Sequence, residues 1–340
     1  SDLTVTSRLD ALTPFWTQLR QSRASYRSKL RALRTVAWPR GLFAVESAPI
    51  SDNTWLCQRR HANKALSMDK PGVNPMLLLG LVEAYVDPEF VALIRTVGET
   101  RLNCPLDFWA SDLFPLAAGI TNSPPSSPAA VLLGRIQKVG IAIKPTGHWE
   151  DRVGLFHPAH VNFAELCHRL QWQWHQYVCA AVSHRKDFHG LDMVDTTTTR
   201  QAINRLAVDD QSMLRLSLAG GLFTQDAHVH WNEGTGSCKW CGQLDSLRHR
   251  YFECPNTLDL RTSLAPDVLP LLDLLPEAMV LRSWAIYPPT HLAWLRLLDS
   301  VPCAVPSLAC AFKPGVLNQD RKSTRLNSSH VKRSRMPSSA

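Results

Sequence analysis

The chain has 340 residues, of which 45% are hydrophobic and 19% are charged. This length leaves room for about two domains, and the composition is that of a chain that folds around a core. No uninterrupted apolar stretch approaches the roughly 20 residues that a transmembrane helix needs, and the N-terminus shows no secretory signal pattern. We therefore expect no membrane partner. Because the chain begins with Ser1 rather than Met, we expect the natural reading frame to start upstream.

The formal net charge of +8 is concentrated near the C-terminus. Residues 320–340 hold six basic residues against one acidic residue, which leaves a net charge of only +3 for residues 1–319. Residues 320–330 and 334–340 match the in-frame translation of the two sides of a sequencing adapter, separated by a gap the size of an index. We therefore expect residues 320–340 to be translated adapter sequence without a function. The alternative is a disordered basic tail or a nuclear localisation patch.

The nine cysteines are odd in number and irregularly spaced. Because no export signal is present, we expect a reducing compartment, in which clustered cysteines are metal ligands more often than disulfides. The sequence therefore indicates an intracellular protein, cytoplasmic or nuclear.

Helical periodicity and proline-rich connections dominate the sequence and predict a mainly α fold. Apolar residues at helical spacing predict one or two helices over residues 9–36 and a long helix over 162–182, which Asn162 would cap. Asp87-Pro88 predicts the start of a short core helix over 87–97, with Asp87 as its cap. Short strands are expected only around residues 140–144 and 152–156, among several glycines and prolines.

Composition divides the chain into successive segments. They are a basic helical region (1–121), a Pro- and Gly-rich linker with possible short strands (122–160), a second helical region (161–225), a cysteine-rich knuckle (226–262), a Pro- and Leu-rich connection (263–319) and the tail (320–340).

Five arginines without an intervening acid form the main basic pattern. They are Arg20, Arg23, Arg27, Arg31 and Arg34, at spacings of 3, 4, 4 and 3. On one continuous helix their guanidinium groups would share a narrow face. Because a guanidinium group grips phosphate with two donors, this face would suit a nucleic-acid backbone. The alternative is an ordinary solvated helix face.

The sharpest motif is Cys238-x2-Cys241-x7-His249-x4-Cys254. Zn2+ prefers four tetrahedral thiolate and imidazole ligands, and a Cys-x2-Cys turn presents two sulfurs at once. Gly242, which directly follows the second cysteine, gives that turn freedom at positive φ. Because protein ligands would fill all four positions, we expect a structural zinc site. The nearby His228 and His230 are competing ligands that the spacing disfavours.

Basic and aromatic residues accompany these four ligands. They are Lys239, Trp240, Arg248, Arg250, Tyr251 and Phe252. Small zinc knuckles use such side chains to contact phosphates and to stack on single-stranded bases, and we expect this role for all except Phe252. The alternative is that the aromatic rings pack the small knuckle core.

Two further patterns suggest chemistry only weakly. The first consists of His168, Trp172, His175 and Cys179, at spacings of 4, 3 and 4 on the predicted 162–182 helix. We expect this stripe to be aromatic core, since such pattern matches are weak evidence for metal. The second, Asp209-Asp210, resembles the Mg2+-binding aspartate pair of polymerases, but it lies between two predicted helices, where Asp210 would cap the second. The sequence contains no complete active site.

Residues 216–226 (LSLAGGLFTQD), the Cys238/Cys241/His249/Cys254 set and Pro255 resemble the C-terminal part of non-LTR retrotransposon reverse transcriptases. Residues 26–38 and 59–66 are similar to the basic, helical thumb of that family. The resemblance implies a thumb-like region over 1–121 and a CCHC zinc knuckle that binds the RNA or target DNA of the element. It also implies that the catalytic palm with its Mg2+ lies before Ser1 and that any ribonuclease H domain lies after Gln319.

The functional hypothesis is therefore a nucleic-acid-binding, C-terminal fragment of an RNA-directed DNA polymerase that lacks its catalytic palm. Its expected partners are RNA or DNA and the palm. The alternative is a stand-alone helical protein whose zinc site staples a protein-interaction surface, and the small charge of residues 1–319 favours it.

Overall fold

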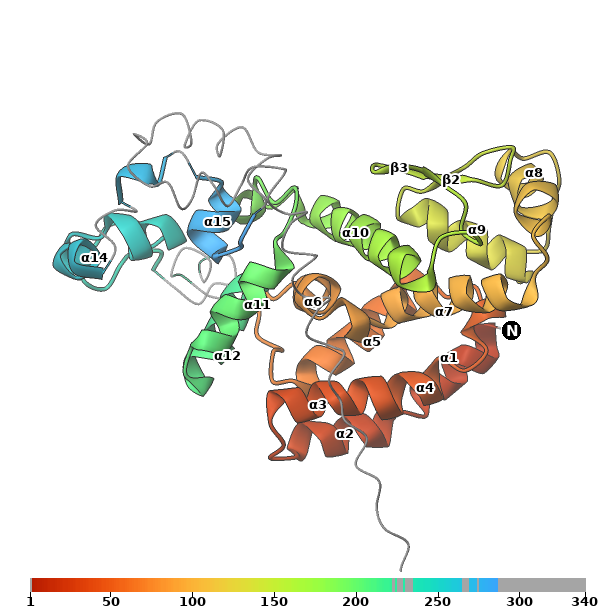
Figure 1. Cartoon of the computed structure of the whole chain (residues 1–340). Coiled ribbons are helices and arrows are strands. Elements are labelled where there is room, and N and C mark those ends of the chain that lie inside the picture. Colours follow the sequence, from red (N-terminus) through yellow and green to blue (C-terminus); the bar gives the residue numbers. More distant parts are fainter. Residues whose placement is uncertain are drawn as a thin grey trace, which may run out of the picture.

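The computed structural model describes residues 2–221, 224, 229, 235–264, 269–273 and 275–286. Within them the fold is mainly α, as predicted, with one three-stranded sheet (Figure 1). In this part of the chain, no helix combines the length and the apolar character that crossing a bilayer requires. The expected adapter tail (320–340) and most of the expected connection before it (287–319) lie outside the described residues.

The first part of the chain is a series of short helices. They are α1 (Asp2–Asp10), α2 (Thr13–Gln21), α3 (Tyr26–Ala32), the π-helix η1 (Leu33–Ala37), α4 (Trp38–Gly41) and the 3-10 helix η2 (Val45–Ser47). The helical structure is interrupted between α2 and α3. There Ser25 Oγ accepts a hydrogen bond from Ser28 N at 3.2 Å and caps α3.

This break corrects the expectation that the five arginines share one face of a continuous helix. Arg20 lies on α2 and Arg23 lies in the break, whereas Arg27, Arg31 and Arg34 lie on α3 and η1. The serine cap starts a new helix and therefore resets the helical phase between Arg23 and Arg27.

The centre of the molecule is built by the next group of helices. They are α5 (Asp52–Ala65), α6 (Pro75–Leu77), the π-helix η3 (Leu78–Val82), the 3-10 helix η4 (Ala84–Val86) and α7 (Pro88–Asn103). Asp87 caps α7 as its sequence suggests, because Oδ1 accepts hydrogen bonds from the backbone N–H groups of Glu89 and Phe90. Asp87 also forms an ion pair with the buried Arg59, whose Nε lies 2.7 Å from Asp87 Oδ2, and this pair connects α5 to the start of α7.

The expected linker, residues 122–160, forms regular structure that packs into the core. The elements from Cys104 onward are the π-helix η5 (Trp109–Leu113), α8 (Phe114–Ala117), α9 (Pro128–Lys138), β1 (Ala142–Ile143), β2 (Trp149–Asp151) and β3 (Gly154–Phe156). The strands are antiparallel in the order β1-β2-β3, and Trp149 pairs with Phe156. The strands β1 and β3 lie within the two predicted segments, whereas β2 was not predicted. From α9, Arg135 donates to the carbonyl groups of Val45 and Ala48 and so fixes α9 against η2.

The long helix α10 (Phe163–Val182) has the predicted bounds and the predicted cap. Asn162 Oδ1 accepts a hydrogen bond from Glu165 N at 2.7 Å. The apolar residues on one face of α10 are buried except Phe163 at its start, which is 46% exposed. The buried ones are Leu166, Leu170, Trp174 and Val178. In the stripe that runs from His168 to Cys179, the buried Cys179 is part of the core, as expected.

The last described elements surround the cysteine-rich segment. They are the 3-10 helix η6 (Lys186–Phe188), α11 (Thr196–Arg205), α12 (Val208–Leu218), the π-helix η7 (His249–Glu253), the 3-10 helix η8 (Pro255–Thr257), α14 (Leu258–Leu264), the 3-10 helix η9 (Leu269–Leu271) and α15 (Glu277–Arg282). The expectation that Asp210 caps the second helix of this region is wrong, because α12 begins at Val208 and Asp210 lies in its first turn. An acidic side chain there still interacts favourably with the helix dipole.

A return of the chain closes the fold. After α14 the chain returns to the helical body, where α15 packs against η6, and α14 lies on the side of α12 away from α1 (Figure 1). Ala278 N donates to His189 O at 3.0 Å, and Trp284 Nε1 donates to Leu218 O at 3.1 Å. One buried apolar cluster therefore extends from Val5 on α1 to Ile286.

Candidate metal centre and its surface

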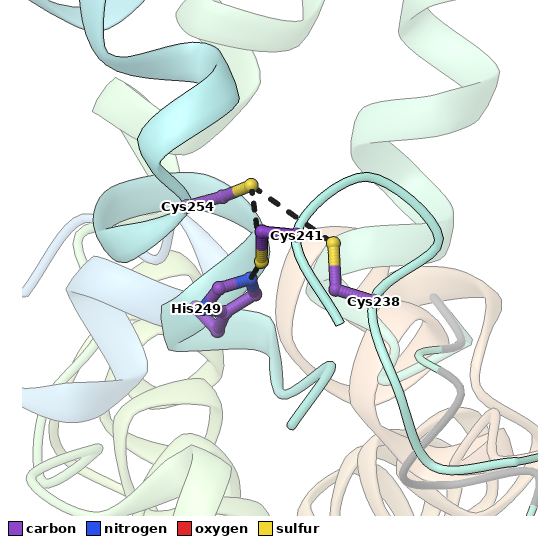
Figure 2. A group of neighbouring side chains, drawn as sticks. All are labelled: Cys238, Cys241, His249 and Cys254. Carbon is purple, nitrogen blue, oxygen red and sulfur yellow. Dashed lines mark hydrogen bonds between the residues drawn. The ribbon is translucent and has the colours of Figure 1, made fainter. Parts of the chain in front are cut away.

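The four predicted ligands converge on one point (Figure 2). Cys254 Sγ lies 3.9 Å from the Sγ atoms of Cys238 and Cys241, and Cys241 Sγ lies 3.1 Å from Nε2 of His249. All four ligand atoms lie within 4.8 Å of one another, and together they could hold a metal ion. No second group of three or more His, Cys, Asp or Glu side chains is so arranged in the described part of the chain.

A tight turn presents the first two sulfurs. Gly242 N donates to Cys238 O at 2.8 Å, and Cys238 N donates to Gln243 O at 2.6 Å. Gly242 has φ +77°, a conformation that favours glycine, which agrees with the role predicted for it. The Cys-x2-Cys spacing and the glycine therefore act together to place both sulfurs on one side of the turn.

A single π-helical turn presents the other two ligands. His249 is the first residue of η7, where its backbone N–H donates to Ser246 Oγ at 3.0 Å. Cys254 directly follows η7, and its backbone N–H donates to His249 O at 2.8 Å. Cys238, His249 and Cys254 are buried, whereas Cys241 is partly exposed. The π-helix η7 thus directs the side chains of His249 and Cys254 toward the two cysteines of the preceding turn.

Backbone donors prepare the cysteine turn for metal. The backbone N–H groups of Trp240 and then Cys241 donate to Cys238 Sγ and lower the pKa of the Cys238 thiol to about 6. A thiolate is the form that binds metal, so these hydrogen bonds favour the ligand state. The pKa of Cys241 is raised instead, because burial and next the neighbouring sulfurs of Cys238 and Cys254 outweigh the lowering effect of the hydrogen bond from the backbone N–H of Gln243.

Within the described part of the knuckle, residues 235–262, the tip of the turn is exposed to solvent. Trp240 is 50% exposed, and the Nζ atom of Lys239 lies 4.7 Å from the centre of its ring. Asn256 Nδ2 donates to Trp240 O at 2.9 Å and so fixes the backbone beneath the ring. A cation and an exposed indole therefore stand together on the outer side of the metal centre.

The other predicted contact residues of the knuckle have partners within the protein. Arg248 forms ion pairs with Glu253, Asp273 and Glu277, and Arg250 pairs with the buried Asp245. These contacts hold the knuckle together and join it to the segment that leads into α15. The guanidinium groups of Arg248 and Arg250 therefore already have anionic partners.

The aromatic pair on η7 lies on the inner side of the knuckle. Tyr251 and Phe252 make an edge-on ring contact at 6.1 Å and line an apolar groove of about 390 Å³ between α12 and α15. Tyr251 is 37% exposed. The two rings therefore pack inside the protein, as the alternative hypothesis from the sequence proposed, and remain partly accessible to solvent.

The structure divides the five N-terminal arginines. Arg20 makes an exposed contact with Asp69 at 4.0 Å, and the exposed Arg23 lies in the break before α3. Arg27, Arg31 and Arg34 line one cleft, together with the more distant Arg200 and Arg215. Sequence reasoning missed these last two, because 165 or more positions separate them from Arg34 and no local spacing connects them.

The expectation that the histidine stripe on α10 is core is only partly confirmed, because Cys179 is buried and Trp172 and His175 are partly buried, whereas His168 is exposed. Burial lowers the pKa of His175 to about 4, and Gln171 Nε2 lies 3.5 Å from its Nε2 atom. The competing ligands His228 and His230 lie outside the described residues.

Comparison of the chain with protein-family models, with curated proteins and with solved structures finds no match. Function is therefore argued from the geometry of the sites themselves.

Proposed function

We propose that this chain binds single-stranded nucleic acid and that a structural Zn2+ ion holds the knuckle in its binding shape. The observation that carries the proposal is the closed Cys3His cluster with Lys239 and Trp240 exposed at the tip of its turn. The ion would order the turn, and the tip would contact the strand.

The donor set and its spacing support zinc. Tetrahedral zinc sites, with Zn–S bonds of about 2.3 Å and Zn–N bonds of about 2.0–2.1 Å, place two sulfurs about 3.8 Å apart and sulfur and nitrogen about 3.6 Å apart. The corresponding distances here are 3.9 Å between sulfurs and 3.1 Å between Cys241 Sγ and His249 Nε2. The widest separation among the four ligand atoms is within 4.8 Å, so shifts of up to about 1 Å would close the tetrahedron, and the four ligands leave no open position for catalysis.

The tip suits a single strand better than a duplex. An exposed indole offers a flat surface on which an unpaired base can stack, and a neighbouring ammonium group can contact phosphate. Because Arg248 and Arg250 already pair with carboxylates, Lys239 and Trp240 are the residues to which we assign most of the contact. Tyr251 is secondary, since it lines the inner groove.

The polymerase setting rests on the resemblance to non-LTR retrotransposon reverse transcriptases. In this setting the palm, with its Mg2+, would come from polypeptide upstream of Ser1. This chain would supply thumb and knuckle contacts to RNA or DNA rather than catalysis.

A second candidate function is a zinc-stapled protein-interaction module. It is favoured by the network of Arg248 with Glu253, Asp273 and Glu277, because these contacts use the knuckle arginines to brace the knuckle rather than to meet a ligand. In this case the exposed tip would contact a protein.

Fluorescence anisotropy with a labelled single-stranded 12-mer, as RNA and as DNA, tests the main proposal. We expect affinity to fall steeply between about 50 and 200 mM salt, because binding releases counterions from the strand. Trp240→Ala should weaken binding about tenfold, since stacking on an aromatic ring contributes about 1–3 kcal/mol per base. Lys239→Glu should also weaken binding and flatten the salt dependence.

Arg152→Glu, at an exposed position in the turn between β2 and β3, is the matched charge control and should leave affinity within a factor of two to three. Weak binding that is flat across salt, or equal binding by wild type and both tip variants, would contradict the proposal. Unchanged binding by the tip variants would put the interaction module ahead.

A further inference from the structure

A cleft of about 600 Å³ lies between α3–η1, the η3–η4 stretch and the helix pair α11–α12. Its charged lining consists of five arginines and one glutamate: Arg27, Arg31, Arg34, Arg200, Arg215 and Glu83. Three separate parts of the sequence contribute these side chains, so the fold itself assembles the charge. A concentration of one sign in a concave site raises the local potential above that of an open surface.

Neutral groups, not carboxylates, orient the arginines of this cleft. Arg200 Nε donates to Val82 O at 2.7 Å, and Arg27 Nη2 donates to Asn204 Oδ1 at 2.8 Å. Arg31 and Arg34 are exposed and have no carboxylate partner among the described residues. The guanidinium groups of Arg27 and Arg200 are therefore held by neutral partners, and those of Arg31 and Arg34 are open to solvent.

Arg215 is the least expected member of the group, because its side chain is only 5% exposed. Its guanidinium group lies 4.0 Å from the centre of the Tyr26 ring, and Nη2 donates to Gln211 Oε1 at 3.2 Å. Its Nε and the hydroxyl of Tyr26 are both buried without a hydrogen-bond partner. A buried donor without a partner costs about 1–3 kcal/mol, so a bound acceptor would be stabilising here.

Glu83 is the only acidic group in the cleft lining. Burial raises the pKa of Glu83, and the nearby Arg200, Arg215, Arg34 and Arg27 oppose that shift. Four of the five guanidinium groups thus act on one carboxylate, and a single negative charge cannot balance them. The cleft has room and charge for a further anion.

We propose that this arginine cleft binds the phosphate groups of a ligand, either a free polyphosphate or the backbone of a strand. Guanidinium groups match the oxygens of phosphate with two parallel donors, and several around one cavity suit adjacent phosphates. The volume lies within the roughly 300–1,000 Å³ of ordinary small-ligand sites. The proposal does not depend on the knuckle, since none of the lining residues belongs to it.

Isothermal titration of the full chain with inorganic pyrophosphate at low salt tests the cleft directly. The double variant Arg31→Glu, Arg34→Glu should weaken binding at least tenfold, and circular dichroism checks that its helices remain. Glu83→Gln should have the opposite effect and tighten binding several-fold, because it removes the only lining carboxylate. The matched control is Arg40→Glu, an exposed arginine on α4 outside the cleft, which should change affinity less than twofold.

Absence of pyrophosphate binding at millimolar concentration, or equal affinity for wild type and all variants, would overturn the proposal. Competition between pyrophosphate and the 12-mer would identify the strand backbone as the source of the phosphates, and binding of pyrophosphate without competition would identify a free polyphosphate. The two proposals also fail separately. Loss of strand binding with intact pyrophosphate binding defeats only the knuckle function, and the reverse result defeats only the cleft.

Discussion

Nε2 of His249 lies 3.1 Å from Sγ of Cys241, although the two side chains come from a helical turn and from a glycine-containing turn eight positions apart. Neither element is long enough to hold this geometry by its own hydrogen bonds alone. An ion bound by these four soft ligands would stabilise such a short segment, and metal binding and folding of the segment would then be one process.

The first prediction concerns metal content. Purified chain should contain about one Zn2+ per molecule, and Cys254→Ser should contain none, because three remaining ligands leave a structural site open. Metal analysis after dialysis measures this. Cys57→Ser is the control, since Cys57 is an exposed cysteine on α5, and it should keep the ion. Equal metal content in both variants would disprove the assignment.

The second prediction concerns removal of the ion from the whole chain. A strong chelator should make residues 235–257 sensitive to protease, while the helices of α1 to α12 remain folded, because the large apolar core does not include the four ligands. Far-ultraviolet circular dichroism should therefore change little as the protease cuts appear. A cooperative loss of all helix on chelation would show that the knuckle holds the whole fold together.

The third prediction concerns the buried ion network of α5 and α7. Arg59→Met should lower the free energy of unfolding by about 3–5 kcal/mol, because two buried carboxylates lose a cation and only Glu89 keeps a second one, Lys138. The two carboxylates are those of Asp87, at 2.7 Å from Arg59 Nε, and Glu89, at 2.7 Å from Nη2. Urea unfolding measures the loss. Arg60→Met, at the exposed neighbouring position, should stay within about 0.5 kcal/mol of wild type.

The fourth prediction concerns pH. Burial, and next Arg200 and His168, lower the pKa of His175 to about 4, below the value of about 6.5 in an unfolded chain. Between these two values the unfolded chain binds more protons, so acidification removes stability, by about 2–3 kcal/mol once pH 4 is reached. His175→Gln should show a smaller loss between pH 6.5 and pH 4 in urea unfolding. If the free energy of unfolding of the variant and of wild type fell equally with pH, the lowered pKa of His175 would not be the cause.

The fifth prediction concerns the return of the chain after the knuckle. Trp284 is fully buried and donates to Leu218 O, so Trp284→Ala should cost about 3–5 kcal/mol through the cavity and the lost hydrogen bond. Trp240→Ala is the matched control. That tryptophan is half exposed at the knuckle tip, and its removal should change stability by less than about 0.5 kcal/mol.

Local signals in the sequence predicted the elements that depend on local physics. The α10 helix with its Asn162 cap and the Asp87 cap of α7 needed only periodicity and a capping side chain. The ligand set followed from spacing in the same way, because all four residues lie on one short segment.

Features that depend on distant residues were not visible in the sequence. The break between α2 and α3 is set by a single serine cap, which a continuous arginine spacing conceals. The arginine cleft needs Arg200 and Arg215 from another helix pair, and only the folded chain brings them to α3. Similarly, the carboxylate partners of Arg248 lie up to 29 positions away, so its internal role could not be seen from the motif.

The hydrogen bond between Trp284 and Leu218 has one more consequence, which concerns insertion. The chain leaves the helical body after α12 and, 66 residues later, comes back to the carbonyl group at the end of that same helix. An excursion whose two ends meet can be lengthened, shortened or exchanged without pulling the body apart, as domain insertions in general require. The candidate metal centre therefore lies on an exchangeable segment, and a short peptide in place of residues 235–264, which keeps α15 and its contact with His189, would be expected to leave a foldable helical body.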